Sequence, residues 1–154
     1  MIVPVFVDTN VFVYRFDTTE PDKHRRCAEW LDQLGADRSG RVSRQGQHEL
    51  YTTLSRKLAM PRNEARRVVA SLEAWRPLIL GRDDQEAAWR LEDRFALAWW
   101  DALIVASAQR CGARVLLTED LQHGQDFDGL RVVNPFRASP DDGLAVHDDQ
   151  PTYG

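Results

Sequence analysis

The sequence predicts an α/β protein, a three-layer sandwich with a mainly parallel sheet of four to five strands. Short apolar runs alternate along the chain with longer segments whose apolar residues have helical spacing. The runs at 2–7 and 115–117 contain no polar residue, as is typical of strands covered by helices on both faces. Strands that alternate with helices in this way favour parallel pairing.

The first half of the chain alternates the two kinds of element. Pro21 is placed to open a helix, because proline fits the first helical turn, and Gly35 is placed to end it. Leu50, Leu54 and Leu58 recur every fourth residue, which predicts a helix with one buried face. The expected elements are a strand at 2–7, a short helix or loop at 10–16, a helix over 21–34 carrying Cys27, Trp30, Leu31 and Leu34, a brief strand within 38–43, and a helix over 45–59.

The second half continues the alternation. Pro61 is expected to start an amphipathic helix that ends before Pro77, and Asp84 is expected to cap the next one. The most apolar helix begins at Trp99 and is closed by Gly112. The remaining expected elements are short strands at 78–80 and 115–118, a loop around 123–124 and a last strand at 130–133.

Length and charge predict one domain with a different C-terminal segment. A chain of 154 residues can bury a core without disulfides or a structural metal. Its net charge of −4 comes from residues 138–154, which contain four Asp and no Lys or Arg, whereas the rest holds 20 acidic and 20 basic residues. We therefore expect a folded domain over 1–137 and an acidic, poorly ordered tail over 138–154.

The two cysteines and the hydropathy pattern indicate where in the cell the protein is expected. Cys27 and Cys111 are far apart and lie in apolar helical contexts, which favours reduced core thiols. The chain has no apolar span of 18 residues and no basic start followed by an apolar run. The prediction is a soluble, cytoplasmic protein that does not contact a membrane.

Four carboxylates, Asp8, Glu49, Asp101 and Asp120, each stand beside an apolar segment that should be buried. Asp8 and Asp120 follow apolar strands, where ligands of open α/β sheets collect, and Asp101 begins the most apolar helix. Taken singly, each also fits a structural role: a helix cap, a partner of a helix dipole or, for Glu49, a solvated helix face. Together they predict a shared site, because such acids repel each other unless a cation lies between them.

The ligand chemistry predicts a hard metal ion. Carboxylate oxygens without nearby Cys or His select Mg²⁺ or Mn²⁺ over Zn²⁺. Asp8, Asp101 and Asp120 are the expected metal ligands, directly or through water, and Glu49 is expected to ligate a second ion or to orient an attacking water. Such a site suits in-line attack of water on a phosphodiester.

Other polar and aromatic residues lie beside these acids. Thr9, Asn10, Ser43 and Thr118 could orient the carboxylates or contact phosphate, and turn capping is their alternative role. Adjacent tryptophans at a helix start could stack on bases, but more often one is a core residue and the other a rim residue. This alternative applies to Trp99 and Trp100.

Four separated motifs resemble the PIN-domain nucleases, most closely the VapC-type toxins of bacterial toxin–antitoxin pairs. The motifs are Val7-Asp8-Thr9-Asn10, Glu49 after Ser43-x-Gln45, Trp100-Asp101-Ala102-Leu103-Ile104, and Leu117-Thr118-Glu119-Asp120-Leu121 with Gly124. The resemblance covers about residues 2–136. It implies a PIN-like fold, a Mg²⁺- or Mn²⁺-dependent endoribonuclease with these four acids as its quartet, Asn10 and Thr118 in support, a homodimer, and an antitoxin that occupies the active-site groove.

Two other functions compete with this one. A phosphoryl-transfer enzyme could use Asp8 as a nucleophile, but that chemistry calls for a second Asp two residues on, where Asn10 stands. A non-catalytic RNA- or protein-binding module could use the same fold, although an intact set of acids argues against it.

Overall fold

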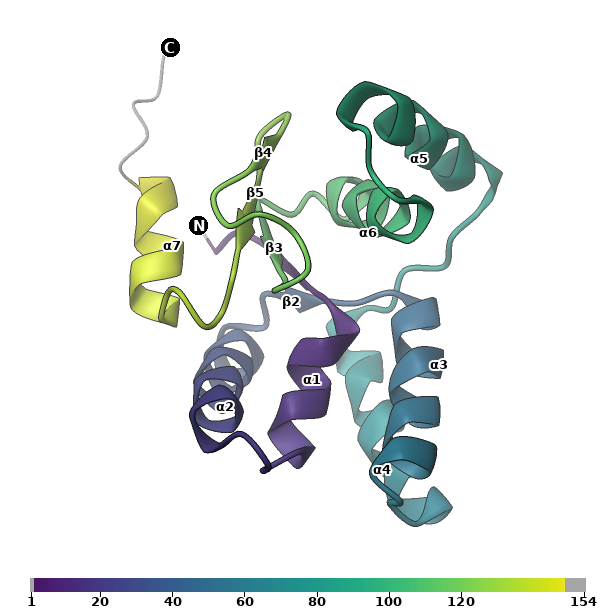
Figure 1. The fold of residues 1–154 in the computed structure, drawn as a ribbon, viewed down its shortest axis with the longest axis vertical. Helices are drawn as coiled ribbons and strands as arrows, with labels where there is room; N and C mark the ends of the chain where they lie inside the picture. Colours follow the sequence, from purple (N-terminus) through teal and green to yellow (C-terminus); the bar gives the residue numbers. More distant parts are fainter. Residues whose placement is uncertain (1, 149–154) are drawn as a thin grey trace.

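A five-stranded sheet in the order β2-β1-β3-β5-β4 forms the middle layer of the molecule (Figure 1). The structure is a computed structural model that describes residues 2–148. The strands are β1 (Val5–Val7), β2 (Gly40–Arg41), β3 (Val115–Leu117), β4 (Asp126–Phe127) and β5 (Leu130–Val133). All neighbouring strands pair in parallel except β4 with β5. The predicted fold class is confirmed.

The strand order reverses direction at β1. The chain passes from β1 to β2 on one side, and later returns to β3 on the other side of β1. The register pairs Val7 with Leu117, so the residues that follow β1 and β3 emerge together at one edge of the sheet. Ligands of open α/β sheets bind at such a topological switch point.

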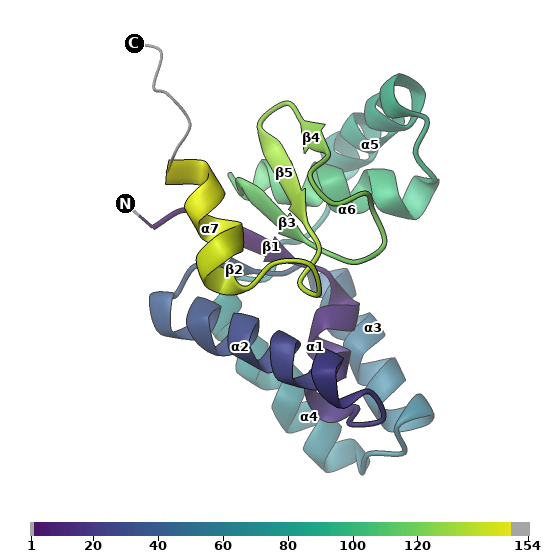
Figure 2. The same cartoon turned by 60° about the vertical axis from the view of Figure 1, so that its left-hand side comes forward.

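Helices cover both faces of the sheet (Figures 1 and 2). The first four lie on one face, and α5 and α6 lie on the other. Their bounds are α1 (Thr9–Phe16), α2 (Pro21–Asp37), α3 (Arg44–Thr52), α4 (Arg62–Ser71), α5 (Arg82–Phe95), α6 (Trp99–Arg110) and α7 (Pro140–Asp148). A π-helical turn, Thr53–Lys57, extends α3, and a 3₁₀ turn, Leu72–Trp75, extends α4.

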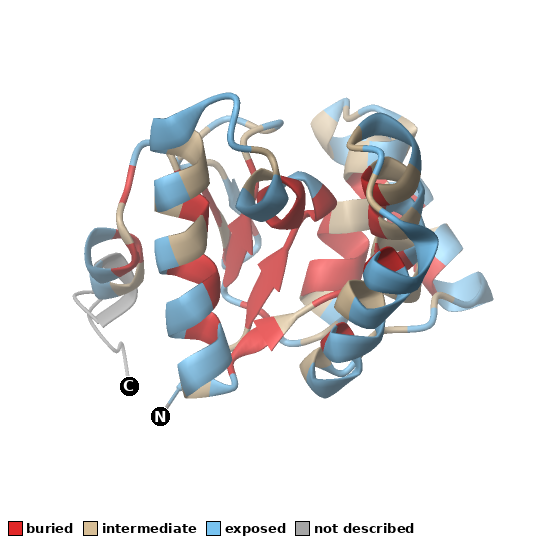
Figure 3. Cartoon of the chain, turned by 90° about the horizontal axis from the view of Figure 1, so that it is seen from below, coloured by how far each residue is buried: buried red, intermediate tan, exposed pale blue. Residues whose placement is uncertain are grey.

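Alternating strand residues divide the interior into two apolar layers (Figure 3). Val5 and Val7 of β1 join the core under α1 to α4, whereas Phe6 between them joins the core under α5 and α6. This alternation follows from the period of two in a β-strand. Because both of their faces are buried, β1 and β3 are apolar throughout. The strands toward the edges each contain one charged residue, namely Arg41 in β2, Asp126 in β4 and Arg131 in β5.

Several local predictions were wrong in detail. Gly35 does not end α2, which continues to Asp37 and stops at Arg38 in a left-handed conformation. Leu78 makes only an isolated bridge to Ser43, so 78–80 is not a strand. Asp84 lies in the first turn of α5 and accepts a hydrogen bond from the backbone N–H of Gly81, the cap residue, at 2.8 Å.

The predicted disordered tail was also partly wrong. Helix α7 forms within it because two contacts fix it to α2. The indole N–H of the fully buried Trp30 donates to the carbonyl of Ala138 at 2.9 Å, and Gly143 lies against the same ring. Residues 149–154, the end of the predicted tail, lie outside the described residues. The domain boundary at 137 stays a prediction.

Both cysteines are free thiols. Cys27 is buried, and burial raises its pKa to about 12, so the thiol is protonated at neutral pH. Cys111 is half-buried and packs against the core under α5 and α6. None of the helices within 2–148 is both long and apolar enough to span a bilayer.

Candidate active site

The ends of β1 and β3 bring two of the predicted acids together. Asp8 follows β1 directly, and its backbone N–H donates to the carbonyl of Leu117, the last residue of β3, at 3.1 Å. The chain after β3 then supplies Thr118 and Asp120 beside it. The side chain of Asp8 also caps α1 by accepting from the N–H of Thr9 at 2.8 Å. The capping role and the site role therefore coexist in one carboxylate.

Asp8 is buried and has an unusual charge environment. Its second oxygen accepts a hydrogen bond from the Thr118 hydroxyl at 2.8 Å, and only 8% of the residue is exposed. Burial, the largest cause, together with the nearby Asp120 carboxylate raises the pKa of Asp8 to about 6, against the lowering effect of the Thr118 hydrogen bond. A charge that is this costly to hold is typical of a functional site.

Glu49 comes from the other side of the site, on α3. Its carboxylate accepts hydrogen bonds from the Thr9 hydroxyl and from the Gln45 amide, both at 3.2 Å. Thr9 thus contacts both acids, since its backbone donates to Asp8 and its side chain to Glu49. Glu49 is otherwise exposed, with its carboxylate open to further donors.

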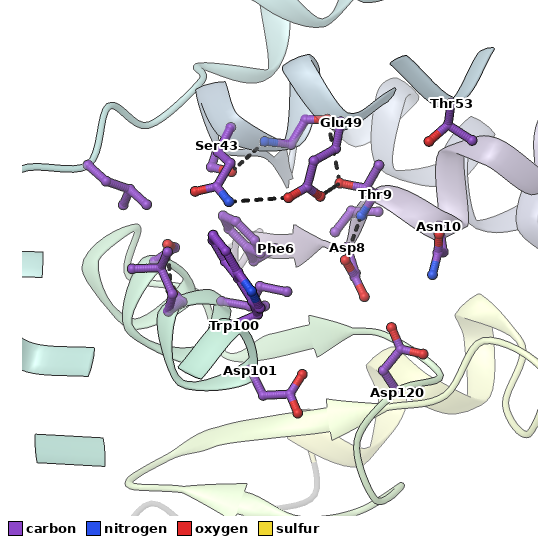
Figure 4. Close-up of a pocket in the computed structure, with 17 residues that line it drawn as sticks. Phe6, Asp8, Thr9, Asn10, Ser43, Glu49, Thr53, Trp100, Asp101 and Asp120 are labelled. Atoms are coloured by element: carbon purple, nitrogen blue, oxygen red, sulfur yellow. Dashed lines mark hydrogen bonds between the residues drawn. The ribbon is translucent and has the colours of Figure 1, made fainter. Parts of the chain in front are cut away.

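Asp101 and Asp120 complete the group of acids (Figure 4). Asp101 lies in the first turn of α6, and burial followed by repulsion from Asp120 raises its pKa. The backbone N–H of Asp120 donates to the Thr118 hydroxyl at 3.1 Å, which fixes the start of the loop after β3. Asp8 and Asp101 therefore both experience the charge of Asp120, as expected of neighbouring carboxylates.

All four acids line one pocket of about 340 Å³. Its other walls come from β1, the start of α1, α3 with the turn that follows it, α6 from Trp100 to Ser107, and Leu80. The lining residues are Phe6, Val7, Asp8, Thr9, Asn10, Ser43, Gln45, Gly46, Glu49, Thr53, Leu80, Trp100, Asp101, Leu103, Ile104, Ser107 and Asp120. No Lys or Arg is among them, so the pocket is strongly acidic.

The acids lack protein counter-ions. No ion pair formed within 2–148 includes any member of the quartet. Asp8 is buried, Asp101 is half-buried, and Glu49 and Asp120 are exposed. Neighbouring carboxylates without basic partners favour a bound cation, which offsets their repulsion. Among the same residues, no three Asp, Glu, His or Cys side chains form a ready-made metal cage. A Mg²⁺ ion at this site would therefore take one or two carboxylates directly and keep waters or substrate phosphate as its other ligands.

The four predicted supporting residues have different positions. Thr9 is buried between two acids, and Asn10 is an exposed pocket residue in the first turn of α1. Thr118 is buried and supports Asp8 from behind the pocket wall. Ser43 lines the pocket and also caps α3, since its hydroxyl accepts from the N–H of Gly46 at 3.0 Å.

Sequence reasoning did not anticipate Thr53 and Ser107 in the pocket. Ser107 could have been predicted, because it follows Trp100 by seven residues and so lies on the same face of α6. Thr53 was predictable in the same way, because it follows Glu49 by four residues and its backbone N–H donates to the Glu49 carbonyl, which keeps it on the Glu49 face of the helix.

The fold and the arrangement of acids define a class of protein. The family model of the PIN domain matches residues 5–125. The chain belongs to the PIN domain family. A search of curated proteins found no match by sequence.

Solved structures with the same fold include toxins of toxin–antitoxin pairs. A toxin–antitoxin complex from Klebsiella pneumoniae is 20% identical with a TM-score of 0.62, over 85% of this chain and 97% of that one. VapC20 of Mycobacterium tuberculosis, a toxin that cleaves the sarcin–ricin loop, is 20% identical with a TM-score of 0.56, over 73% and 86%. DNA-bound VapBC from Salmonella typhimurium is 16% identical with a TM-score of 0.62, over 86% and 98%.

Proposed function

We propose that this protein is a Mg²⁺- or Mn²⁺-dependent endoribonuclease that acts as the toxin of a toxin–antitoxin pair on cytoplasmic RNA. The observation that carries the proposal is the pocket itself: four carboxylates from four separate parts of the chain line it, and within residues 2–148 none of them forms an ion pair. Membership of the PIN domain family and the shared fold with VapC toxins support the same activity.

The quartet divides into two roles. Asp8, Asp101 and Asp120 would hold the cation, directly or through water, because they line the same pocket and the charge of Asp120 acts on both Asp8 and Asp101. When bound, a divalent cation would neutralise phosphodiester charge and make a water easier to deprotonate. Glu49 would accept a hydrogen bond from the attacking water, since each of its oxygens has a lone pair beyond those used by Thr9 and Gln45.

The hydrogen bonds around Asp8 disfavour its use as a nucleophile. Each of its oxygens already accepts a hydrogen bond, and its carboxylate is almost fully buried. Thr118 and the N–H of Thr9 hold it in one orientation, which suits a ligand better than an attacking group. This geometry favours hydrolysis over phosphoryl transfer through Asp8.

Cleavage of RNA with and without metal tests the proposal. Wild-type protein is expected to cut a labelled structured RNA only when Mg²⁺ or Mn²⁺ is present. Asp8→Asn and Asp101→Asn should each lower the rate by about a hundredfold or more, because a lost ligand charge removes several kcal/mol of transition-state stabilisation. Asp93→Asn, an exposed acid that lines neither this pocket nor the adjacent one, should cleave normally. Full activity in excess EDTA, or in either ligand variant, would contradict the mechanism.

The proposed partners are a small antitoxin and a second copy of the chain. An Arg or Lys of the antitoxin would enter the acidic pocket, because the quartet lacks a cation of its own. The Klebsiella, Salmonella and Rickettsia structures are toxin–antitoxin complexes by name. Co-expression with the adjacent small gene product should yield a stable complex without RNase activity. Recovery of the chain alone, together with an unaffected host, would count against this partnership.

A further inference from the structure

Trp100 has no evident structural role. Its residue is 61% exposed, and it belongs to neither of the two apolar layers. Its neighbour Trp99 is the contrasting case, because it packs against the core under α5 and α6 and contacts Trp89. An exposed indole loses the hydrophobic stabilisation that burial would provide. Its position is therefore better explained by binding than by folding.

The exposed indole lines the acidic pocket (Figure 4). It precedes Asp101 on α6, and Ile104 and Ser107 continue the same helix face along the pocket wall. In Figure 4 the ring lies beside Phe6 in the view, with the carboxylate of Asp101 next to it. A substrate with its reacting group at the acids would thus meet an aromatic face within the same pocket.

A second pocket begins where the first one ends. Leu80 lines both, and the second pocket, of about 620 Å³, is bordered by Arg82 and Arg110. Both arginines are ion-paired, Arg82 with Glu86 and Arg110 with Asp84, so this second pocket is not a free basic site. The feature that fits a nucleic-acid strand is the open aromatic ring beside the acidic site, because a base can stack on it while its phosphate lies at the acids.

We propose that Trp100 is a stacking platform for an unpaired nucleobase next to the phosphodiester that is cut. The inference rests on the proposed ribonuclease function and specifies its substrate class as single-stranded or looped RNA. A base within a duplex has both faces covered by its neighbours, whereas an unpaired base can place one face on the indole. Stacking tolerates any base, so Trp100 would select for an accessible nucleotide and not for a particular sequence.

Binding to RNA in an inactive background tests this platform. Anisotropy would follow a fluorescent unstructured RNA strand, alone and annealed to its complement, in Mg²⁺. All proteins would have Asp8→Asn so that the strand stays intact. Adding Trp100→Ala should weaken single-strand binding by about tenfold or more, the contribution of one stacked base. Trp100→Phe should retain most of the affinity, because it keeps an aromatic ring. Thermal melts would confirm that each variant is folded.

Trp89→Ala is the matched control, because Trp89 is 48% exposed and lines neither pocket. It should bind the single strand as the parent does, and annealed RNA should bind all variants equally. Unchanged single-strand binding by Trp100→Ala would overturn the platform and leave a protein partner as the occupant of this surface. An equal loss in Trp89→Ala, or an equal loss for annealed RNA, would overturn it too. Absence of metal-dependent cleavage by wild-type protein would instead refute the ribonuclease function, independently of these binding results.

Discussion

At the scale of single residues, the free-energy cost of burying charge in the site is concentrated in Asp8. Burial is the main reason that its pKa rises from 3.8 to about 6. For an acid with a raised folded-state pKa, the folded protein binds more protons than the unfolded chain between these two values. Stability is therefore greatest below about pH 4 for this group, falls as pH rises from 4 to 6, and stays low above 6. The loss is roughly 3 kcal/mol at about 1.4 kcal/mol per pKa unit.

Asp8→Asn should remove this pH-dependent loss in metal-free protein. We expect urea unfolding in EDTA to show that wild-type stability declines between pH 4 and 6.5 more steeply than that of the variant. At pH 7 the variant should be at least as stable, although Asn can accept only one of the two hydrogen bonds that Asp8 accepts. Asp93→Asn should keep the wild-type slope. Parallel slopes for wild type and Asp8→Asn would show that the charge on Asp8 is not destabilising.

At the scale of elements, the strand ends were predictable and the precise helix faces were not. Asp8 and Asp120 could be placed together from sequence, because apolar strands of a parallel sheet must end at one edge. Glu49 was the least distinctive of the four candidates, since its place beside the apolar stripe of a helix is shared by many solvated Glu residues. Its place at the site depends on contacts from Thr9 and Gln45 that form only after folding.

Very short elements were also beyond prediction. Strand β4 has two residues, so its pattern carries almost no information, and it forms because Phe127 pairs with Leu130 and enters the core. The sequence also did not predict which of the two adjacent tryptophans at the start of α6 faces the core. Adjacent residues of a helix point about 100° apart, so a small rotation of the helix decides which one enters the core, and here it is Trp99.

Helix α7 gives a test at the same scale through two glycine substitutions of opposite expected sign. Ala is favoured over Gly in a helix by about 0.5–1 kcal/mol. In α2, a Cβ added at Gly35 meets nothing within 4 Å, so Gly35→Ala should raise the melting temperature. In α7, a Cβ added at Gly143 would lie 2.7 Å from the buried indole of Trp30, so Gly143→Ala should lower it. Thermal melts of both variants check the pair, and an equal rise in both would mean that α7 does not pack against Trp30.

At the scale of the whole molecule, the fold assembles like charges where they repel. Outside the acidic C-terminal segment the chain has balanced charge, yet the switch point of the sheet gathers four carboxylates with no basic residue in the pocket lining. From the sequence, these acids were expected to repel one another, an effect that raises the pKa of a carboxyl group. The structure shows that burial is the larger cause for both Asp8 and Asp101, with the charge of Asp120 acting in the same direction.

This arrangement predicts that the metal-free protein is less stable than the metal-bound protein. Removing one charge by Asp101→Asn or Asp120→Asn should raise the melting temperature in EDTA at pH 7.5, because the remaining acids then repel less. Millimolar Mg²⁺ should raise the melting temperature of the wild type, since an ion that binds only the native state stabilises it by mass action. The rise should be smaller in both variants, which lack a ligand charge. Melting curves of the three proteins with and without Mg²⁺ make the comparison. If Mg²⁺ has no effect on the wild type and both variants melt below it in EDTA, the acids act as structural caps and do not share a cation.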